Sequence, residues 1–161
     1  MQKNERLSMH STVVRNIFLI LLGFLGLGAI VGGIVLMISP TGELMGMPLS
    51  EFKNLPFDNY FIPGLILFAV LGIIPLLLIP ALLKKPKSIL ADKINIFKDM
   101  HWSWTFGIYI AFILVGWIHF QLVFLQGEVH WLQTFYIFYA LLIILVALLP
   151  QIRHNYRKEI Q

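Results

Sequence analysis

The sequence contains no cysteine and few charged residues, and each lack excludes a class of protein. Without cysteine the chain has no disulfide framework, no thiol nucleophile and no thiolate metal site. Charged residues make up 12% of the chain, whereas soluble proteins contain about 25%. The sequence also lacks a phosphate-binding loop, a dinucleotide fingerprint and a serine nucleophile elbow. A soluble domain with one of these common chemistries is therefore excluded.

The chain consists mostly of long apolar runs, and hydrophobic residues make up 58% of it. A helix that crosses the bilayer core needs about 20 apolar residues. Four runs meet this requirement, at residues 16–38, 60–83, 102–125 and 131–149. We therefore predict an all-α polytopic membrane protein, a single domain over residues 1–161 in which four transmembrane helices form a bundle. A long outer loop with a short interfacial helix joins the first two spans.

Glycine and proline mark two of the spans. Gly28 and Gly32 form a GxxxG pattern in the first span, and Gly33 extends this small-residue face. Such faces allow close helix packing, which we expect within the bundle. A homo-oligomer, a membrane-protein partner or a lipid tail against the same face are the alternatives. Pro75 lies inside the second span and predicts a kink there.

The basic residues predict the orientation of the spans. Every lysine and arginine except Lys53 falls on one side if both termini lie on that side. Lys and Arg are enriched in cytoplasmic loops, so both termini are expected in the cytoplasm. Because these residues flank apolar spans, the net charge of +4 indicates topology rather than nucleic-acid binding.

The segment between the second and third spans is polar and rich in lysine. Leu90, Ile94 and Phe97 fall on one helical face between residues 84 and 101. This pattern is typical of a short amphipathic helix on the membrane surface. Its lysines either bind anionic lipids or only set the orientation.

The loop after the first span, residues 39–64, is too long and too apolar to be a simple connection. Pro40 and Gly42 have turn chemistry, and the turn would direct Glu43 back over the bundle. We therefore expect residues 40–58 to cover the outer mouth of the bundle, with Glu43 within reach of His119. A histidine inside a span usually faces the bundle interior, and such residues often belong to functional sites. We therefore treat His119 as a candidate site residue.

The candidate site residues all lie toward the outer side. Candidate catalytic residues are His119, Glu43 and Glu128, and candidate ligand-binding residues are Glu43, Asp58, His119, His130 and Gln133. These groups could form ordinary interhelical hydrogen bonds, with His119 bonded to Glu43, Tyr139 or a carbonyl. They could instead form a His/carboxylate site, or a cavity for a lipid headgroup or other small amphiphile. No HxxxH or HExxH motif is present, so neither a metal nor a cofactor is expected.

Parts of the sequence resemble a group of known proteins. The blocks at residues 40–48 and 56–64, together with residues 131–133 and the 148–150 end, are similar to small four-helix bacterial membrane proteins of uncharacterised function. This resemblance implies a four-helix plan and a bacterial cytoplasmic membrane, and it carries no activity.

Three functions remain open from the sequence. We expect a non-enzymatic membrane protein, a lipid-binding accessory or a partner subunit, with membrane lipids as its partners. The alternatives are a membrane-embedded enzyme that modifies lipids through the His/carboxylate site, and a subunit of an oligomeric transporter.

The orientation can be tested by cysteine labelling, because the chain has no native cysteine. Cysteines that replace Lys53 or Glu128 should react with a membrane-impermeant reagent in intact cells. A cysteine that replaces Lys87 should react only after the membrane is permeabilised. Reaction of the Lys87 variant alone in intact cells would reverse the orientation.

Overall fold

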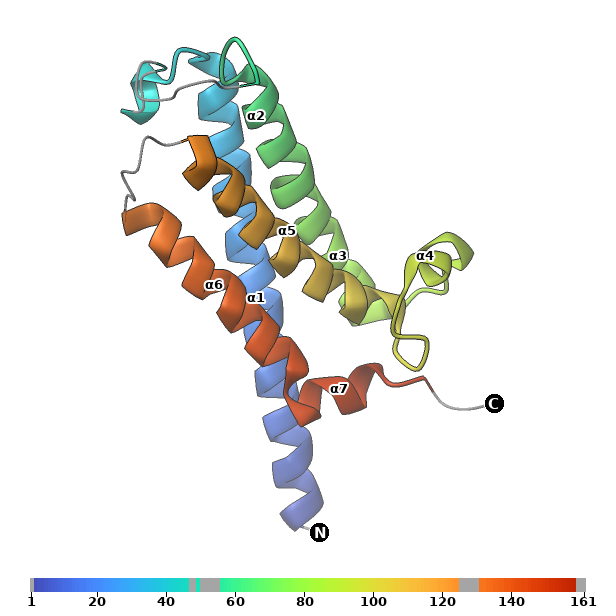
Figure 1. Ribbon diagram of the computed structural model, residues 1–161. Helices are drawn as coiled ribbons and strands as arrows, with labels where there is room; N and C mark the ends of the chain where they lie inside the picture. Colours follow the sequence, from blue (N-terminus) through green and yellow to red (C-terminus); the bar gives the residue numbers. More distant parts are fainter. Residues whose placement is uncertain (1, 47–48, 50–55, 125–130, 159–161) are drawn as a thin grey trace.

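The computed structural model describes residues 2–46, 49, 56–124 and 131–158, which form helices and short connections (Figure 1). In chain order the helical elements are α1 (Gln2–Ile38), η1 (Glu43–Met45), α2 (Phe61–Ile66), η3 (Leu67–Ile73), α3 (Ile74–Lys84), α4 (Ile89–Ile94), α5 (Trp102–Phe124), α6 (Trp131–Leu148) and α7 (Pro150–Tyr156). η1 is a 3₁₀ turn and η3 is a π-helix. α2, η3 and α3 follow one another without a break and form one long helix.

Four segments are long and apolar enough to cross a membrane. They are Ser11–Ile38, Phe61–Lys84, Trp102–Val123 and Trp131–Leu148. The predicted all-α plan with four membrane-length helices is thus confirmed, and the chain is a multi-pass membrane protein.

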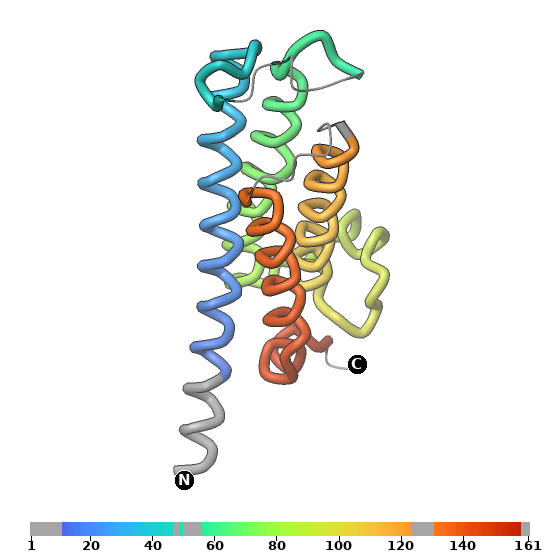
Figure 2. The backbone as a smooth tube through the Cα atoms, turned by 60° about the vertical axis from the view of Figure 1, so that its left-hand side comes forward, coloured from blue at the N-terminus to red at the C-terminus, as the bar shows by residue number. Residues whose placement is uncertain are grey.

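The four long helices run alternately up and down (Figures 1 and 2). α1 lies against the α2–η3–α3 helix, and α5 lies against α6. We call the end that holds the start of α1, α4 and α7 the α7 end, and the opposite end the η1 end. The buried core between the helices is apolar apart from a few polar side chains, and its largest members include Phe18, Leu22, Trp104 and Ile143.

Glycines bring α1 and the second long helix into backbone contact at two points. A Cβ atom added to Gly33 would lie 2.7 Å from the carbonyl oxygen of Gly64, and one added to Gly26 would lie 3.0 Å from that of Gly72. Such short distances leave no space for a side chain. Gly28 and Gly32 differ, because a Cβ on either would meet its nearest neighbour at 3.5 Å, an ordinary contact.

The proline in the second span follows an irregular turn. Pro75 stands in the first turn of α3, immediately after the π-helix η3. The amide of Ile74 donates to the carbonyl of Ala69, five residues earlier. Because proline lacks an N–H, it cannot continue the regular hydrogen bonding. A π-turn is a common way for membrane helices to adjust their backbone bonds around such a residue.

The turn after α1 forms as predicted. Gly42 has a φ of 81°, in the left-handed region that favours glycine, and its amide donates to the carbonyl of Ser39 at 2.9 Å. The amide of Tyr60 donates to the carbonyl of Pro40 at 2.9 Å, which joins the two ends of the loop. Most of the stretch expected to form the interfacial helix, residues 48–56, lies outside the described residues.

The amphipathic segment between the second and third spans is less helical than predicted. α4 covers only six residues, and Ser88 caps its start by accepting a bond from the amide of Ala91. Leu90 and Ile94, which we placed on its apolar face, are 77% and 63% exposed. That face is therefore turned away from the bundle.

Two neighbouring glycines offer a test of the α1 contact. Gly33→Ala should destabilise the protein by about 1–3 kcal/mol, because the added methyl group overpacks a backbone contact. Gly32→Ala should leave stability unchanged or raise it by up to about 1 kcal/mol, because alanine is the better helix former and has space. Thermal unfolding in detergent measures both. Equal melting temperatures for the two variants would contradict the assigned contact.

Candidate functional site

The structure does not join His119 and Glu43, the two predicted catalytic residues that it describes. His119 on α5 and Glu43 in η1 are both exposed, and no hydrogen bond or ion pair joins them. Tyr139, the other expected partner of His119, donates its hydroxyl to the carbonyl of Leu21 at 2.7 Å instead. The expected pairing of Glu43 with His119 is therefore wrong.

The pairing fails because α5 presents a different face to the bundle. From the sequence we placed His119 on an inward face of α5, and at helical spacing Phe112 and Gly116 share that face. Phe112 is 60% exposed, and a Cβ on Gly116 would find nothing within 4 Å. The buried face is the one with Trp104, Ile108, Ala111, Leu114 and Ile118. Because α5 is apolar on all sides, the sequence pattern does not distinguish the face toward lipid from the face toward the core.

The other predicted site residues have separate places. Asp58 is exposed in the turn before α2. Glu128 and His130 lie outside the described residues. Gln133 on α6 is 3% exposed and lies inside the bundle. Among all the candidate ligand-binding residues whose side chains the structure describes, it is therefore the one that is buried.

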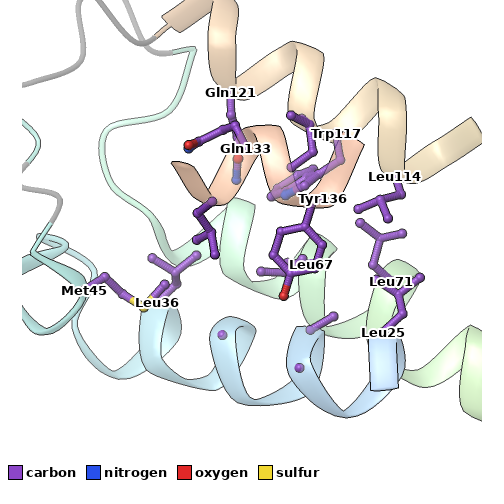
Figure 3. Close-up of a pocket in the computed structure, with 15 residues that line it drawn as sticks. Leu25, Leu36, Met45, Leu67, Leu71, Leu114, Trp117, Gln121, Gln133 and Tyr136 are labelled. Atoms are coloured by element: carbon purple, nitrogen blue, oxygen red, sulfur yellow. The ribbon is translucent and has the colours of Figure 1, made fainter. Parts of the chain in front are cut away.

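Gln133 lines a cavity of about 100 Å³ between α1, η3, α5 and α6, in the half of the bundle nearer the η1 end (Figure 3). Leucines and other apolar groups form most of the wall: Leu25, Ala29, Leu36, Met45, Leu67, Leu71, Leu114, Trp117, Ile118 and Leu132. Gly28 and Gly32 form the wall on α1. The cavity is not sealed, and Gly28 is itself exposed. The small-residue face singled out in the sequence thus borders an open space, whereas Gly33 makes the close helix contact.

Three polar side chains reach this apolar cavity. They are Gln121 on α5 and Gln133 and Tyr136 on α6. Figure 3 shows the two glutamines near each other, while the hydroxyl of Tyr136 points toward α1. The Oε1 atom of Gln133 is buried and has no hydrogen-bond partner among the residues that the structure describes. A buried amide without a partner costs about 1–3 kcal/mol, so this position favours a ligand that donates a hydrogen bond.

Sequence reasoning missed Gln121, Trp117 and Tyr136 as lining residues. Gln121 follows Leu114 and Ile118 at helical spacing, and those two residues are 2% and 3% exposed. This spacing places Gln121 on the same face as two core residues. It could have identified Gln121 only if the inward face of α5 had been known. Tyr136 is one turn after Gln133 on α6, and this spacing alone would have placed it on the same face.

A second group of polar side chains lies at the α7 end, where it holds the chain segments together. Lys158 pairs with Asp92 at 2.9 Å, and the pKa of Asp92 is lowered chiefly by this hydrogen bond. Tyr156 donates its hydroxyl to the carbonyl of Leu82 at 3.0 Å, and burial raises its pKa to about 12. Most of these bonds end on backbone carbonyls, which is typical of groups that fix loops.

His101 belongs to this group and connects the loop before α4 to the start of α5. Its Nε2 lies 3.2 Å from the carbonyl oxygen of Pro86, and its Nδ1 lies 2.8 Å from the hydroxyl of Ser103. Partial burial lowers its pKa. A neutral ring with its proton on Nε2 satisfies both contacts, since it donates to Pro86 and accepts from Ser103.

Within the described part of the chain, no group of three or more histidine, aspartate or glutamate residues could hold a metal ion. The cavity offers hydrogen bonding and apolar contact, and Tyr136 is the titratable side chain among its described lining residues.

The comparisons with known proteins add no relative. No protein-family model, no curated protein and no solved structure matches the chain. The resemblance to small bacterial membrane proteins is supported only at the level of a four-helix protein with four candidate membrane spans.

Proposed function

We propose that this protein is a non-enzymatic membrane protein that binds a lipid-like amphiphile in the cavity between α1, η3, α5 and α6. The observation that carries the proposal is the buried Oε1 atom of Gln133, which lies in a mostly apolar cavity and has no hydrogen-bond partner in the described part of the chain. Ligand sites in proteins have this composition, since apolar walls supply affinity and a few polar groups fix orientation.

The chemistry of the wall defines the ligand. The leucines and Trp117 suit an alkyl or isoprenoid chain, while Gln133 requires a hydrogen-bond donor such as a hydroxyl or an amide N–H. The volume of about 100 Å³ is too small for a whole phospholipid. It fits one end of a chain or a small head that enters from the surrounding bilayer.

The alternative enzyme function loses its main support. It required His119 to face a carboxylate inside the bundle, and both His119 and Glu43 are exposed. A lipid-binding accessory protein or a subunit of a membrane complex needs no reactive group. They require a bundle that holds a lipid and presents its outer surface to a partner.

We further propose that both termini lie in the cytoplasm of a bacterium and that the cavity opens in the outer half of its cytoplasmic membrane. The charges support this orientation. Among the residues that the structure describes, Lys84, Lys85, Lys87, Lys93, Lys98, Arg153, Arg157 and Lys158 gather at the α7 end. The acidic Glu43 and Asp58 lie at the η1 end. Positive charge is retained on the cytoplasmic side.

A pair of matched ligands tests the role of Gln133. Oleyl alcohol and 1-octadecene have the same chain length, but only the alcohol donates a hydrogen bond. The alcohol should raise the melting temperature of the purified protein more than the alkene, because ligands stabilise the state that binds them. Gln133→Leu should reduce the preference for the alcohol by about three- to tenfold in affinity, the value of one hydrogen bond.

Two further variants make the result specific. Gln151→Leu changes an exposed glutamine at the opposite end and should behave like the wild type. Gly28→Leu should weaken binding of both ligands, because its side chain would enter the cavity. If the alcohol and the alkene stabilise wild type equally, or if Gln133→Leu keeps the preference, the proposed role of Gln133 is wrong.

A further inference from the structure

The segment between the second and third spans carries an exposed apolar surface that the bundle does not use. Ile89, Leu90, Ile94 and Ile96 are 80%, 77%, 63% and 67% exposed. They lie outside the four candidate spans. Figures 1 and 2 show α4 beside α5 at the α7 end, away from α1 and α6. In water, four such side chains in one short segment would form an unfavourable apolar patch.

Hydrogen bonds attach this segment to the side of α5. The hydroxyl of Tyr109 donates to the carbonyl of Ile94 at 2.8 Å and accepts from the amide of Ile96 at 3.2 Å. Thr105 donates to the side-chain oxygen of Asn95 at 2.6 Å. These bonds fix where residues 94–96 lie along α5.

The attachment places the segment at the level of the membrane surface. Tyr109 stands seven residues after Trp102, the first residue of the third span, which corresponds to about 10 Å of helix rise. A tyrosine side chain leans back toward the start of its helix. The backbone of residues 94–96 therefore lies beside the first two turns of a membrane span, where the surroundings of α5 are interfacial lipid.

The local backbone directs the isoleucines away from α5. Asn95 has an extended conformation and is 1% exposed, because its side chain faces Thr105 and the carbonyl of Met100. Successive side chains of an extended segment point to opposite sides. Ile94 and Ile96, on either side of the buried Asn95, are 63% and 67% exposed and project outward at the depth that Tyr109 sets.

Lysines border the same apolar surface. Lys84, Lys87 and Lys93 are exposed, and no hydrogen bond or ion pair of their amines occurs among the described residues. By contrast, the amine of Lys98 is held by the carbonyls of Asp92 and Lys93. Apolar side chains at interfacial depth with cations beside them match an anionic leaflet, where basic segments bind acidic headgroups.

We propose that residues 84–98 form an interfacial anchor that inserts Ile89, Leu90, Ile94 and Ile96 among lipid chains and binds anionic headgroups through Lys84, Lys87 and Lys93. The anchor is separate from the cavity at the η1 end and does not depend on its ligand. It acts on the leaflet at the α7 end, whichever compartment that leaflet faces.

Fluorescent labels on single cysteines test the insertion. The full chain, with Ile94→Cys or Lys93→Cys, is labelled with an environment-sensitive dye and reconstituted in phosphatidylcholine vesicles mixed with phosphatidylglycerol. The label at position 94 should be quenched by lipids with a spin label high on the acyl chain and protected from aqueous iodide. The label at position 93, its immediate neighbour, should be accessible to iodide. Leu141→Cys, 45% exposed within α6, provides the reference for a lipid-facing site in a span.

Two outcomes would overturn the insertion. Equal iodide quenching at positions 93 and 94 would show that the segment stands in water. Protection of position 94 from both iodide and lipid quenchers would show that protein covers it, as in a dimer of this chain.

Lipid competition tests the role of the lysines. Quenching of the label at position 94 by spin-labelled phosphatidylglycerol should exceed quenching by spin-labelled phosphatidylcholine. Lys93→Gln should reduce this preference by about fivefold, the effect expected for one lysine near an anionic surface. Arg153→Gln, which removes an exposed cation from α7, is the matched control and should change it little. An unchanged preference in Lys93→Gln, or an equal loss in both variants, would overturn the headgroup assignment.

Discussion

The contact between α1 and the second long helix is the constraint on which the rest of the bundle depends. Between apolar helices in lipid there is no hydrophobic driving force, so close packing has to supply the association. Gly33 and Gly64 meet backbone to backbone, and a Cβ on Gly26 would lie 3.0 Å from the carbonyl oxygen of Gly72. Two other small residues of α1 line the cavity: Gly28 faces Tyr136 of α6, and Gly32 faces Leu67 of η3. The same helix thus makes a close backbone contact on one side and lines the cavity on another.

The two ends of the bundle have different polar chemistry. At the α7 end, side chains bond mainly to backbone: Trp104 donates to the carbonyl of Ala147 at 2.8 Å, and Trp102 to that of Pro86 at 2.7 Å. These bonds connect loops whose backbone groups would otherwise lack partners near lipid. In the cavity, by contrast, the Oε1 atom of Gln133 has no hydrogen-bond partner among the described residues. Polar groups that only stabilise a fold have their hydrogen bonds formed within the protein. The polar groups at the α7 end meet this description, whereas Gln133 in the cavity does not.

The sequence alone predicted the features that depend on composition and on single residues. Span positions follow from the length of apolar runs, and the turn at Gly42 follows from the conformational freedom of glycine. The facing of α5 could not be predicted, because in a membrane the lipid side and the core side of a helix are both apolar. This uncertainty led us to place His119 inside the bundle. Gln133 was identified as a candidate because it is polar within an apolar run, but its missing partner is visible only in three dimensions.

The π-helix η3 has a consequence for the phase of the second span. The two glycine contacts are seven residues apart on α1, from Gly26 to Gly33, but eight apart on its partner, from Gly64 to Gly72. In a regular α-helix eight residues turn through about 80° more than two full revolutions, so Gly72 would point past α1. A π-turn closes its hydrogen bond one residue later than an α-turn, so each turn holds more residues. η3 covers most of the stretch between the two contacts and includes Gly72. Because the π-turns are wider, the eight residues of the second long helix complete the same two revolutions as the seven residues of α1. The irregular segment therefore works as a phase correction, because a regular α-helix that kept all eight residues would rotate one of the two contacts out of register with α1.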